Sequence, residues 1–379
     1  MKGIKKNLNR LLTVDFLFRR TKYKNSVLLI RDDGIGDFLL FSGFLPLYKE
    51  FFLQKGLDLF LLVRKEVFPL ANLYLQEDRI ITLDKKLYYY SLSYRRNFLR
   101  KLLELSPACI VSSIHRSSEG DDIISLIGRG RITIGYEGEI SIKRKNKRFL
   151  FDVFVESFDR KRVPVASKYN HVVYHERHFY SQLSNKKISL VECKPFIPLP
   201  KEENKIANHS YFSCIVGAGS FKRVYPTDKL AKVITFILKK TNFKCLLLGG
   251  EKDLQIASLL VNFLPPSLRD RIINLVGKTS LIESLLLIRD GILTIGNETG
   301  LVHASWIMEI PTIMIYGGGH FGRFLPLNRY GNVVYKRLDC YCCNWRCSYK
   351  ETPVRCIASI KEEDIYQLVD KILKWSIRC

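Results

Sequence analysis

Residues 292–303 read ILTIGNETGLVH. A short apolar run at 292–295 predicts a buried strand, and the residues after position 300 predict a helix over 301–308. Between them lies a turn with a glycine at each end, Gly296 and Gly300. A strand, a glycine turn and a helix in succession form the repeating unit of a parallel α/β sheet.

The same alternation runs through the second half of the chain. We expect strands at 211–216, 244–248, 272–275, 292–295 and 312–316, and helices at 227–240, 254–263, 280–289 and 301–308. The first half begins with a strand at 27–31, a glycine turn at 32–37 and a helix at 38–52, and strands follow at 57–63 and 109–113. Largely apolar strands of this kind belong to parallel sheets that are covered on both faces. The sequence therefore predicts an α/β fold with two Rossmann-like, doubly wound parallel-sheet domains that face each other across a ligand cleft.

Length and composition agree with two domains, since the chain has 379 residues and is 47% hydrophobic. A polar stretch with several prolines marks the boundary between the domains. We assign 1–24 to a basic amphipathic arm, 25–195 to the first domain, 196–208 to a linker, 209–358 to the second domain and 359–379 to a C-terminal helix that crosses back.

Lys and Arg outnumber Asp and Glu by 61 to 37, which gives a net charge of +24 and favours an anionic partner. We expect neither a membrane span nor a signal peptide, because no apolar run reaches the roughly 18–20 residues that cross a bilayer. The expected location is a cytoplasm, because ten cysteines in a large chain without an export signal suit reduced thiols. The arm at 1–24 either rests on anionic lipid or is a solvated basic segment docked on the protein.

Four glycine-rich turns follow predicted strands of the second half, at 217–220, 249–251, 296–300 and 317–319. In a parallel sheet such turns open on one edge, where helix N-termini bind anionic ligands. Thr299 and Gly300 would hold a diphosphate through free backbone N–H groups, with His303 as a further donor. The alternative is that Asn297 or Thr299 only caps the helix.

Two nucleotide-binding motifs are rejected. Gly277-Lys278-Thr279 resembles the end of a P-loop, but Ile272 occupies the place of its first glycine. Gly34-Ile35-Gly36 has Leu39 where the dinucleotide fingerprint needs a third glycine, which weakens a nicotinamide-dependent function.

The glycine turns and their neighbours resemble glycosyltransferase family 9, the heptosyltransferases of the lipopolysaccharide inner core, over about residues 27–360. The matching segments, in the order of the family, are 29–37 (LIRDDGIGD), 217–226 (GAGSFKRVYP), 247–253 (LLGGEKD) and 274–281 (NLVGKTSL) followed by 296–303 (GNETGLVH). Arg223, Glu298 and Tyr225 depart from the family's usual Lys, Asp and Trp. The resemblance implies a GT-B fold, with the acceptor on the first domain and the nucleotide sugar on the second.

The resemblance also implies an inverting transfer of a heptose-like sugar from a nucleotide diphosphate sugar, with ADP-heptose as the expected donor, to a lipopolysaccharide-core or similar anionic glycolipid. Asp37 is the expected base, and its alternative role is to cap a helix that starts at Phe38. Arg223, beside Lys222, is expected to stabilise the leaving diphosphate, so no cofactor or metal is required. The other donor-binding candidates are Gly217, Ser220, Lys222, Gly250, Lys278, Asn297, Glu298, Thr299, Gly300 and His303.

Five of the ten cysteines lie close together near the C-terminus: Cys340, Cys342, Cys343, Cys347 and Cys356. Four thiolates could hold a tetrahedral metal ion, but the spacing does not match the usual pattern of two Cys-x-x-Cys pairs. A structural metal, a disulfide and ordinary reduced thiols all remain open.

Two functions of other classes compete with sugar transfer. The positive charge and the aromatic content of 12% would suit a nucleic-acid-binding protein, but no RNA- or DNA-binding signature is present and the lysines form no single stripe. The second competitor is a non-catalytic nucleotide- or glycolipid-binding protein on the same fold.

Overall fold

The computed structural model describes residues 23–114, 119–137, 148–156, 171–202 and 210–376, and it divides into two compact units. The first unit contains residues 1–164 and 172–195, and the second contains 165–171 and 196–379. Most of the predicted basic arm, residues 1–22, lies outside the described residues. Within the described ranges, no helix is both long and apolar enough to cross a membrane.

The first unit is built on a six-stranded, fully parallel sheet with strand order β3-β2-β1-β4-β5-β6. The central strand, β1, pairs with β2 from Ser26 opposite Asp58 and is completely buried over residues 27–30. The strands are β1 (Lys24–Arg31), β2 (Asp58–Arg64), β3 (Ile80–Leu83), β4 (Pro107–Ser112), β5 (Ile132–Tyr136) and β6 (Val153–Val155).

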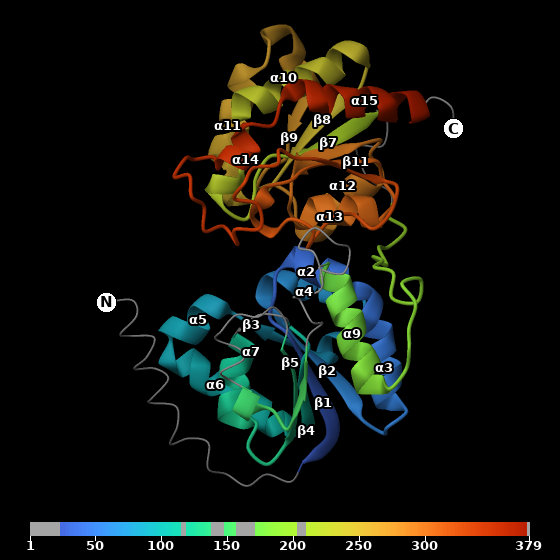
Figure 1. Ribbon diagram of the computed structural model, residues 1–379, viewed down its shortest axis with the longest axis vertical. Coiled ribbons are helices and arrows are strands. Elements are labelled where there is room, and N and C mark those ends of the chain that lie inside the picture. Colours follow the sequence, from blue (N-terminus) through green and yellow to red (C-terminus); the bar gives the residue numbers. More distant parts are fainter. Residues whose placement is uncertain (1–22, 115–118, 138–147, 157–170, 203–209, 377–379) are drawn as a thin grey trace. The chain divides into compact units, whose positions relative to one another are not determined.

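Helices cover both faces of this sheet, with α6 and α7 on one side and α3 and α9 on the other (Figure 1). The helices are α2 (Ile35–Phe41), α3 (Leu45–Leu53), α4 (Phe68–Ala71), α5 (Lys85–Tyr90), α6 (Leu92–Leu105), α7 (Glu119–Ile127) and α9 (Val172–Ser184). The helix expected at 38–52 is therefore wrong in two respects: it starts earlier, at Ile35, and a 3-10 turn at Ser42–Phe44 divides it. At this turn the chain passes so close to the Cys193 carbonyl that Gly43 leaves no room for a Cβ.

The second unit repeats the architecture of the first. Its six parallel strands lie in the order β12-β11-β10-β7-β8-β9, which is the same connectivity as in the first sheet. The strands are β7 (Tyr211–Ile215), β8 (Lys244–Leu248), β9 (Ile272–Asn274), β10 (Thr294–Asn297), β11 (Thr312–Ile315) and β12 (Gly331–Val334). The sequence prediction was two residues early at β10, so Gly296 and Asn297 belong to the strand and not to the turn.

Most helices of the second unit follow the sequence prediction closely: α10 (Thr227–Lys240), α11 (Leu254–Phe263), α12 (Leu281–Arg289), α13 (Gly300–Ile307) and α15 (Glu362–Ser376). The short helix α14 (Arg355–Ala358) was not predicted. The C-terminal helix α15 packs beside α10 (Figure 1), where the rings of Phe236 and Tyr366 stack with centroids 4.2 Å apart. Lys240 Nζ lies 2.6 Å from Asp370 Oδ1 across the same interface. These contacts anchor the end of the described chain to the second sheet.

Candidate functional site

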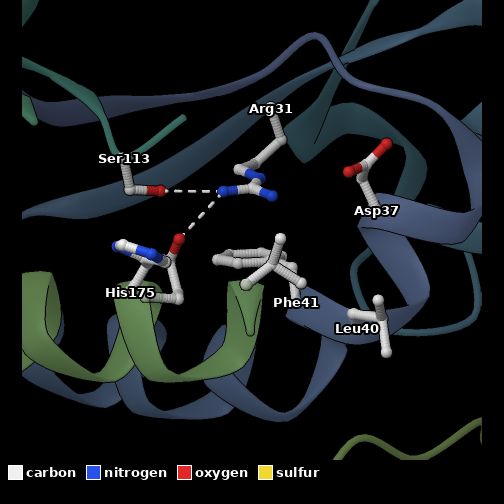
Figure 2. Close-up of a pocket in the computed structure, with 8 residues that line it drawn as sticks. Arg31, Asp37, Leu40, Phe41, Ser113 and His175 are labelled. Atoms are coloured by element: carbon white, nitrogen blue, oxygen red, sulfur yellow. Dashed lines mark hydrogen bonds and ion pairs between the residues drawn. The ribbon is translucent and has the colours of Figure 1, made fainter. Parts of the chain in front are cut away.

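The first candidate site lies in the first unit, at the carboxyl end of β1. A small pocket there is lined by Arg31, Asp37, Leu40, Phe41, Ser113, Val172, His175 and Glu176. Figure 2 shows that Asp37 projects from α2 into the region beside the Arg31 guanidinium. Asp37 occupies the first turn of α2, whose N-cap is Gly34, so its alternative role as the cap residue of the helix is wrong.

Arg31 organises this pocket, although it is only 4% exposed. Its Nη1 donates to Glu176 Oε2 at 3.0 Å and to Ser113 Oγ at 3.1 Å, and its Nη2 donates to Asp33 Oδ2 at 2.5 Å. The guanidinium also lies 4.2 Å from the centre of the Phe41 ring. A buried cation with two carboxylate partners satisfies the requirement that buried charges be paired.

The environment of the same network shifts the pKa values of its acidic residues. Burial raises the pKa of Asp33 to about 7, although Arg31 opposes this shift. Burial likewise raises the pKa of Glu176 against the opposing effects of Arg31 and of Tyr48, whose hydroxyl donates to Glu176 Oε1 at 2.6 Å. Burial alone would lower the pKa of Arg31, but its carboxylate neighbours raise it, so the guanidinium stays charged.

The second candidate site lies in the second unit, at the carboxyl edge of its sheet. The α13 helix begins at Gly300, with Thr299 at the N-cap. No side chain caps this helix, so the interpretation of Asn297 or Thr299 as a side-chain cap is wrong. Among the described residues, the buried Thr299 hydroxyl has no hydrogen-bond partner. The first turn of α13 therefore offers backbone N–H groups and one unused hydroxyl to an anion.

Asn297 is buried and joins this helix start to the neighbouring turn. Its Oδ1 accepts from the Tyr225 N–H at 2.8 Å, and its Nδ2 donates to the carbonyls of Val216 and Gly217 at 3.2 and 3.1 Å. These contacts use both ends of the amide within the protein. Asn297 thus fixes the shape of the site and is not positioned as a direct ligand contact.

Glu298 connects two of the predicted donor-binding residues. Its Oε1 accepts from His303 Nε2 at 3.1 Å, and its Oε2 lies 3.5 Å from Arg223 Nη1. The Trp306 indole N–H donates to His303 Nδ1 at 3.2 Å, which places the imidazole proton on Nε2. Glu298 therefore orients one cation and one neutral histidine at the site.

Arg223 lies at the end of a 3-10 turn, Phe221–Arg223, and remains partly exposed. Its guanidinium lies 5.0 Å from the centre of the Trp345 ring, and its Nη2 occupies the space that a Cβ on Gly219 would take. Trp345, which the sequence analysis did not identify, also donates from Nε1 to His320 Nδ1 at 3.2 Å. Arg223 is thus held on two sides, by a carboxylate and by an aromatic ring.

The remaining predicted residues lie on the same edge of the sheet. Asp253, which ends the family-like segment 247–253 but was not among the expected donor-binding residues, accepts from the Gly250 N–H at 3.0 Å, and its carboxylate fills the space where Gly217 lacks a side chain. Ser220 and Lys222 are exposed beside Arg223. Lys278 is exposed at the end of β9, where its Nζ donates to the Asn274 carbonyl at 3.0 Å.

Four cysteines of the predicted cluster lie in the loop between β12 and α14 and the fifth, Cys356, lies in α14; four of the five thiols line one pocket. That pocket is bordered by Cys340, Cys343, Cys347, Cys356 and neighbouring residues that include Gly318, Tyr341 and Arg355. Cys342 is not among them, and its Sγ lies 4.0 Å from the Phe321 carbonyl. All cysteines of the described ranges are free, and no set of three or more His, Cys, Asp or Glu side chains there is arranged to hold a metal ion.

Two doubly wound parallel sheets with the same strand order, each with candidate polar groups at its carboxyl edge, define an enzyme-like α/β fold of the GT-B class. The chain belongs to glycosyltransferase family 9, described as the heptosyltransferase family, whose model matches residues 144–352. The family resemblance inferred from the sequence is confirmed.

Two curated relatives match part of the chain. The lipooligosaccharide heptosyltransferase 2 of Haemophilus influenzae is 31% identical over 99 residues, which is 26% of this chain and 28% of the relative. The lipopolysaccharide heptosyltransferase 1 of Campylobacter coli is 26% identical over 159 residues, which is 41% of this chain and 45% of the relative. The matched stretches therefore span less than half of either relative.

Solved structures resemble the chain over nearly its whole length. The Escherichia coli ADP-heptose LPS heptosyltransferase II has a TM-score of 0.67 at 14% identity and covers 93% of this chain and 99% of its own. The E. coli heptosyltransferase WaaC with ADP-2-deoxy-2-fluoro heptose has a TM-score of 0.64 at 13% identity, with coverages of 91% and 99%. At these identities the likeness shows the fold, and it confirms the predicted GT-B class.

Proposed function

We propose that the protein is an inverting glycosyltransferase that moves a heptose-like sugar from ADP-heptose to an anionic glycolipid of the lipopolysaccharide-core type. The observation that carries the proposal is the start of α13, where an unused Thr299 hydroxyl and free backbone N–H groups follow Glu298, the residue that pairs with Arg223. These are the groups that neutralise a diphosphate without a metal ion. Membership of the heptosyltransferase family and the ADP-sugar analogue bound by a solved relative support the same donor.

In the proposed reaction an acceptor hydroxyl attacks the anomeric carbon of the donor sugar. A C–O bond to the acceptor forms while the bond from the anomeric carbon to the diphosphate oxygen breaks, and ADP leaves. Asp37 takes the hydroxyl proton, and Arg223 with the N-terminus of α13 stabilises the charge that develops on the diphosphate. Attack from the face opposite the leaving group inverts the anomeric centre.

The net charge of +24 supports an anionic acceptor, and it is the reason we place the protein at the cytoplasmic face of the bacterial inner membrane. A cation-rich protein gains encounter rate and affinity at an anionic lipid surface. Loss of nucleotide release as the salt concentration rises, with a water-soluble acceptor less affected than a membrane-held one, would agree with this placement.

The test is nucleotide release by the purified protein with a panel of ADP, GDP and UDP sugars and a phosphorylated lipopolysaccharide-core acceptor. We expect turnover with ADP-heptose, and a loss of about 10²–10⁴-fold in turnover for Asp37→Asn with donor binding unchanged, as is typical when a general base is removed. Arg223→Ala should weaken both donor binding and turnover. Asp78→Asn is the matched control, since the Asp78 side chain is 74% exposed.

Donor binding without turnover by the wild-type protein would instead indicate a non-catalytic binding protein. Near-normal turnover of Asp37→Asn would remove Asp37 from the role of base.

A further inference from the structure

Trp345 lies beside the cation that we assign to the leaving diphosphate. The Arg223 guanidinium lies over the Trp345 ring, 5.0 Å from its centre. At this distance the negative face of an aromatic ring attracts a guanidinium, and the indole of tryptophan gives the strongest contact of this kind. The Arg223 side chain is 24% exposed, so water screens the attraction only in part. The ring therefore restricts the positions that the guanidinium can take.

Glu298 holds Arg223 from another side, by a single long contact. Glu298 Oε2 lies 3.5 Å from Arg223 Nη1, which is longer than the about 2.7–2.9 Å of a charge-assisted hydrogen bond. One contact of this length does not fix the plane of the guanidinium. The Trp345 ring supplies the missing restraint, and it does so without a second negative charge that would repel a diphosphate.

The Trp345 ring lies in the glycine-rich turn that follows β11. A Cβ on Gly319 would lie 2.4 Å from Trp345 Cδ2, and a Cβ on Gly317 would lie 2.6 Å from Trp345 Cη2. The indole N–H donates to His320 Nδ1 at 3.2 Å. The two glycines thus leave the space that the ring occupies, and His320 fixes the rotation of the ring. At these positions the turn accommodates a side chain of the protein itself.

The backbone that carries Trp345 has an unfavourable conformation. Cys342, Asn344 and Trp345 have φ values of 65°, 51° and 61°, in the left-handed region that residues other than glycine rarely adopt. The Cys342 N–H donates to the Gly318 carbonyl at 2.8 Å. The Asn344 N–H donates to the Gly319 carbonyl at 2.9 Å. Such backbone persists only where surrounding contacts hold it, and it is concentrated at functional sites.

We propose that Trp345 is a positioning residue for sugar transfer, which holds Arg223 in the orientation that meets the leaving diphosphate. This inference rests on the proposed function, in which Arg223 stabilises the charge that develops on the diphosphate. A guanidinium binds two phosphate oxygens in parallel only when its plane is correctly oriented. A guanidinium that is restrained before the donor arrives loses less conformational entropy on binding. Trp345 therefore acts on the donor through Arg223.

The experiment is a double-mutant cycle on ADP affinity, measured by isothermal titration calorimetry with the full-length protein. Trp345→Leu should weaken ADP binding about 3–20-fold, within the energy of one cation–π contact. In an Arg223→Ala background the same change should alter ADP binding by less than about 2-fold, because the side chain through which Trp345 acts is absent. With ADP-heptose, Trp345→Leu should lower kcat more than it raises KM, because the charge on the diphosphate is greatest in the transition state.

Two further variants separate the aromatic contact from a general effect on folding. Trp345→Phe and Trp345→Leu both remove the indole N–H, but only Phe keeps a ring over the guanidinium, so Trp345→Phe should recover most of the lost affinity. Gly319→Ala leaves the ring intact and displaces it, so it should weaken ADP binding as Trp345→Leu does. Thermal unfolding without ADP checks that each variant is folded.

The matched control is Tyr335→Leu, which also replaces an aromatic ring by Leu. Tyr335 is 47% exposed, and its ring packs beside Phe321 and Tyr341 with centroids 4.9 and 6.3 Å apart. We expect this change to leave ADP affinity within about 2-fold of the wild-type value, as is usual for exposed side chains outside a site.

Two results would overturn the proposal while sugar transfer stands. One is equal weakening of ADP binding by Trp345→Leu in the wild-type and Arg223→Ala backgrounds, which would show that Trp345 acts independently of Arg223. The other is a Trp345→Phe protein that binds ADP as weakly as Trp345→Leu. A wild-type protein that does not bind ADP would overturn both this inference and ADP-heptose as the donor. If the cycle shows the expected coupling but no sugar nucleotide is turned over, the proposed function fails while the role of Trp345 in diphosphate binding stands.

Discussion

Replacing Asn297 by Ala tests how the donor edge is held together. The amide makes three hydrogen bonds, to the Tyr225 N–H and to the Val216 and Gly217 carbonyls, and the side chain is buried. A net value of about 1 kcal/mol for each bond, with some additional cost for leaving these buried groups unpaired, predicts that Asn297→Ala lowers the free energy of unfolding by about 3 kcal/mol.

The assay is urea unfolding followed by tryptophan fluorescence. All three tryptophans, Trp306, Trp345 and Trp375, belong to the second unit, so this signal reports on the domain that contains Asn297. Asn262→Ala is the matched control, because Asn262 is exposed on α11 and its change should stay within about 0.5 kcal/mol. An Asn297→Ala protein as stable as the control would refute the inference that this amide fixes the turn.

Two further predictions concern the buried network of the first unit. Glu176→Gln removes one charged partner of the buried Arg31 and should lower the free energy of unfolding by about 3 kcal/mol, measured by far-ultraviolet circular dichroism. The control is Glu104→Gln on the exposed face of α6, which should change the free energy of unfolding little. Equal effects of the two changes would contradict the role of Glu176 as a partner of Arg31. Because burial raises the pKa of Asp33 to about 7, the folded protein keeps a proton on this carboxyl that the unfolded chain releases near pH 4. The contribution of Asp33 to stability is therefore present below about pH 4 and is lost as the pH rises toward 7. Asp33→Asn should therefore flatten the decline in stability between pH 5 and pH 7.5, and an unchanged pH profile would show that Asp33 is ionised throughout.

The sequence predicted the parts of the fold that depend on local pattern. Strands β7, β8, β9 and β11 and all the long helices of the second unit were located within a few residues, because apolar runs and glycine turns alternate there without interruption. Strands β3, β5, β6 and β12 were not predicted. Three of them, β3, β6 and β12, have only three or four residues, which carry too little periodicity to be recognised.

Glycines caused the errors at the sites. Gly296 was interpreted as a turn residue, but it lies inside β10, where a Cβ would collide with Ile215 of the neighbouring strand. Gly34 was assigned to a turn that ends at Asp37, but it caps α2 and so moves Asp37 into the helix. At Gly296 the glycine is required by close packing, which single-sequence pattern does not distinguish from turn formation. At Gly34 a Cβ would meet only Asp37 Oδ2, 3.9 Å away, so packing does not require glycine there.

The residues that complete the candidate sites were not predictable from spacing. Glu176 reaches Arg31 from 145 residues away in the sequence, and Trp345 reaches Arg223 from a loop without regular structure. Neither belongs to a motif, and both become partners only because the sheet and its helices bring distant segments together. Spacing likewise does not show that four of the five clustered cysteines line one pocket, since this depends on which side chains face it.

The long sequence separation between Arg31 and Glu176 also determines when this buried ion pair can form during synthesis on the ribosome. The strand that carries Arg31 is synthesised before α9, which carries its buried partner 145 residues later. At translation rates of about 5–20 residues per second, this delay is about 7–30 s. Throughout that time the nascent first domain must keep an arginine hydrated that the finished domain buries. The first domain therefore completes its folding only after α9 has left the exit tunnel, and chaperones that bind exposed apolar strands have that interval in which to act.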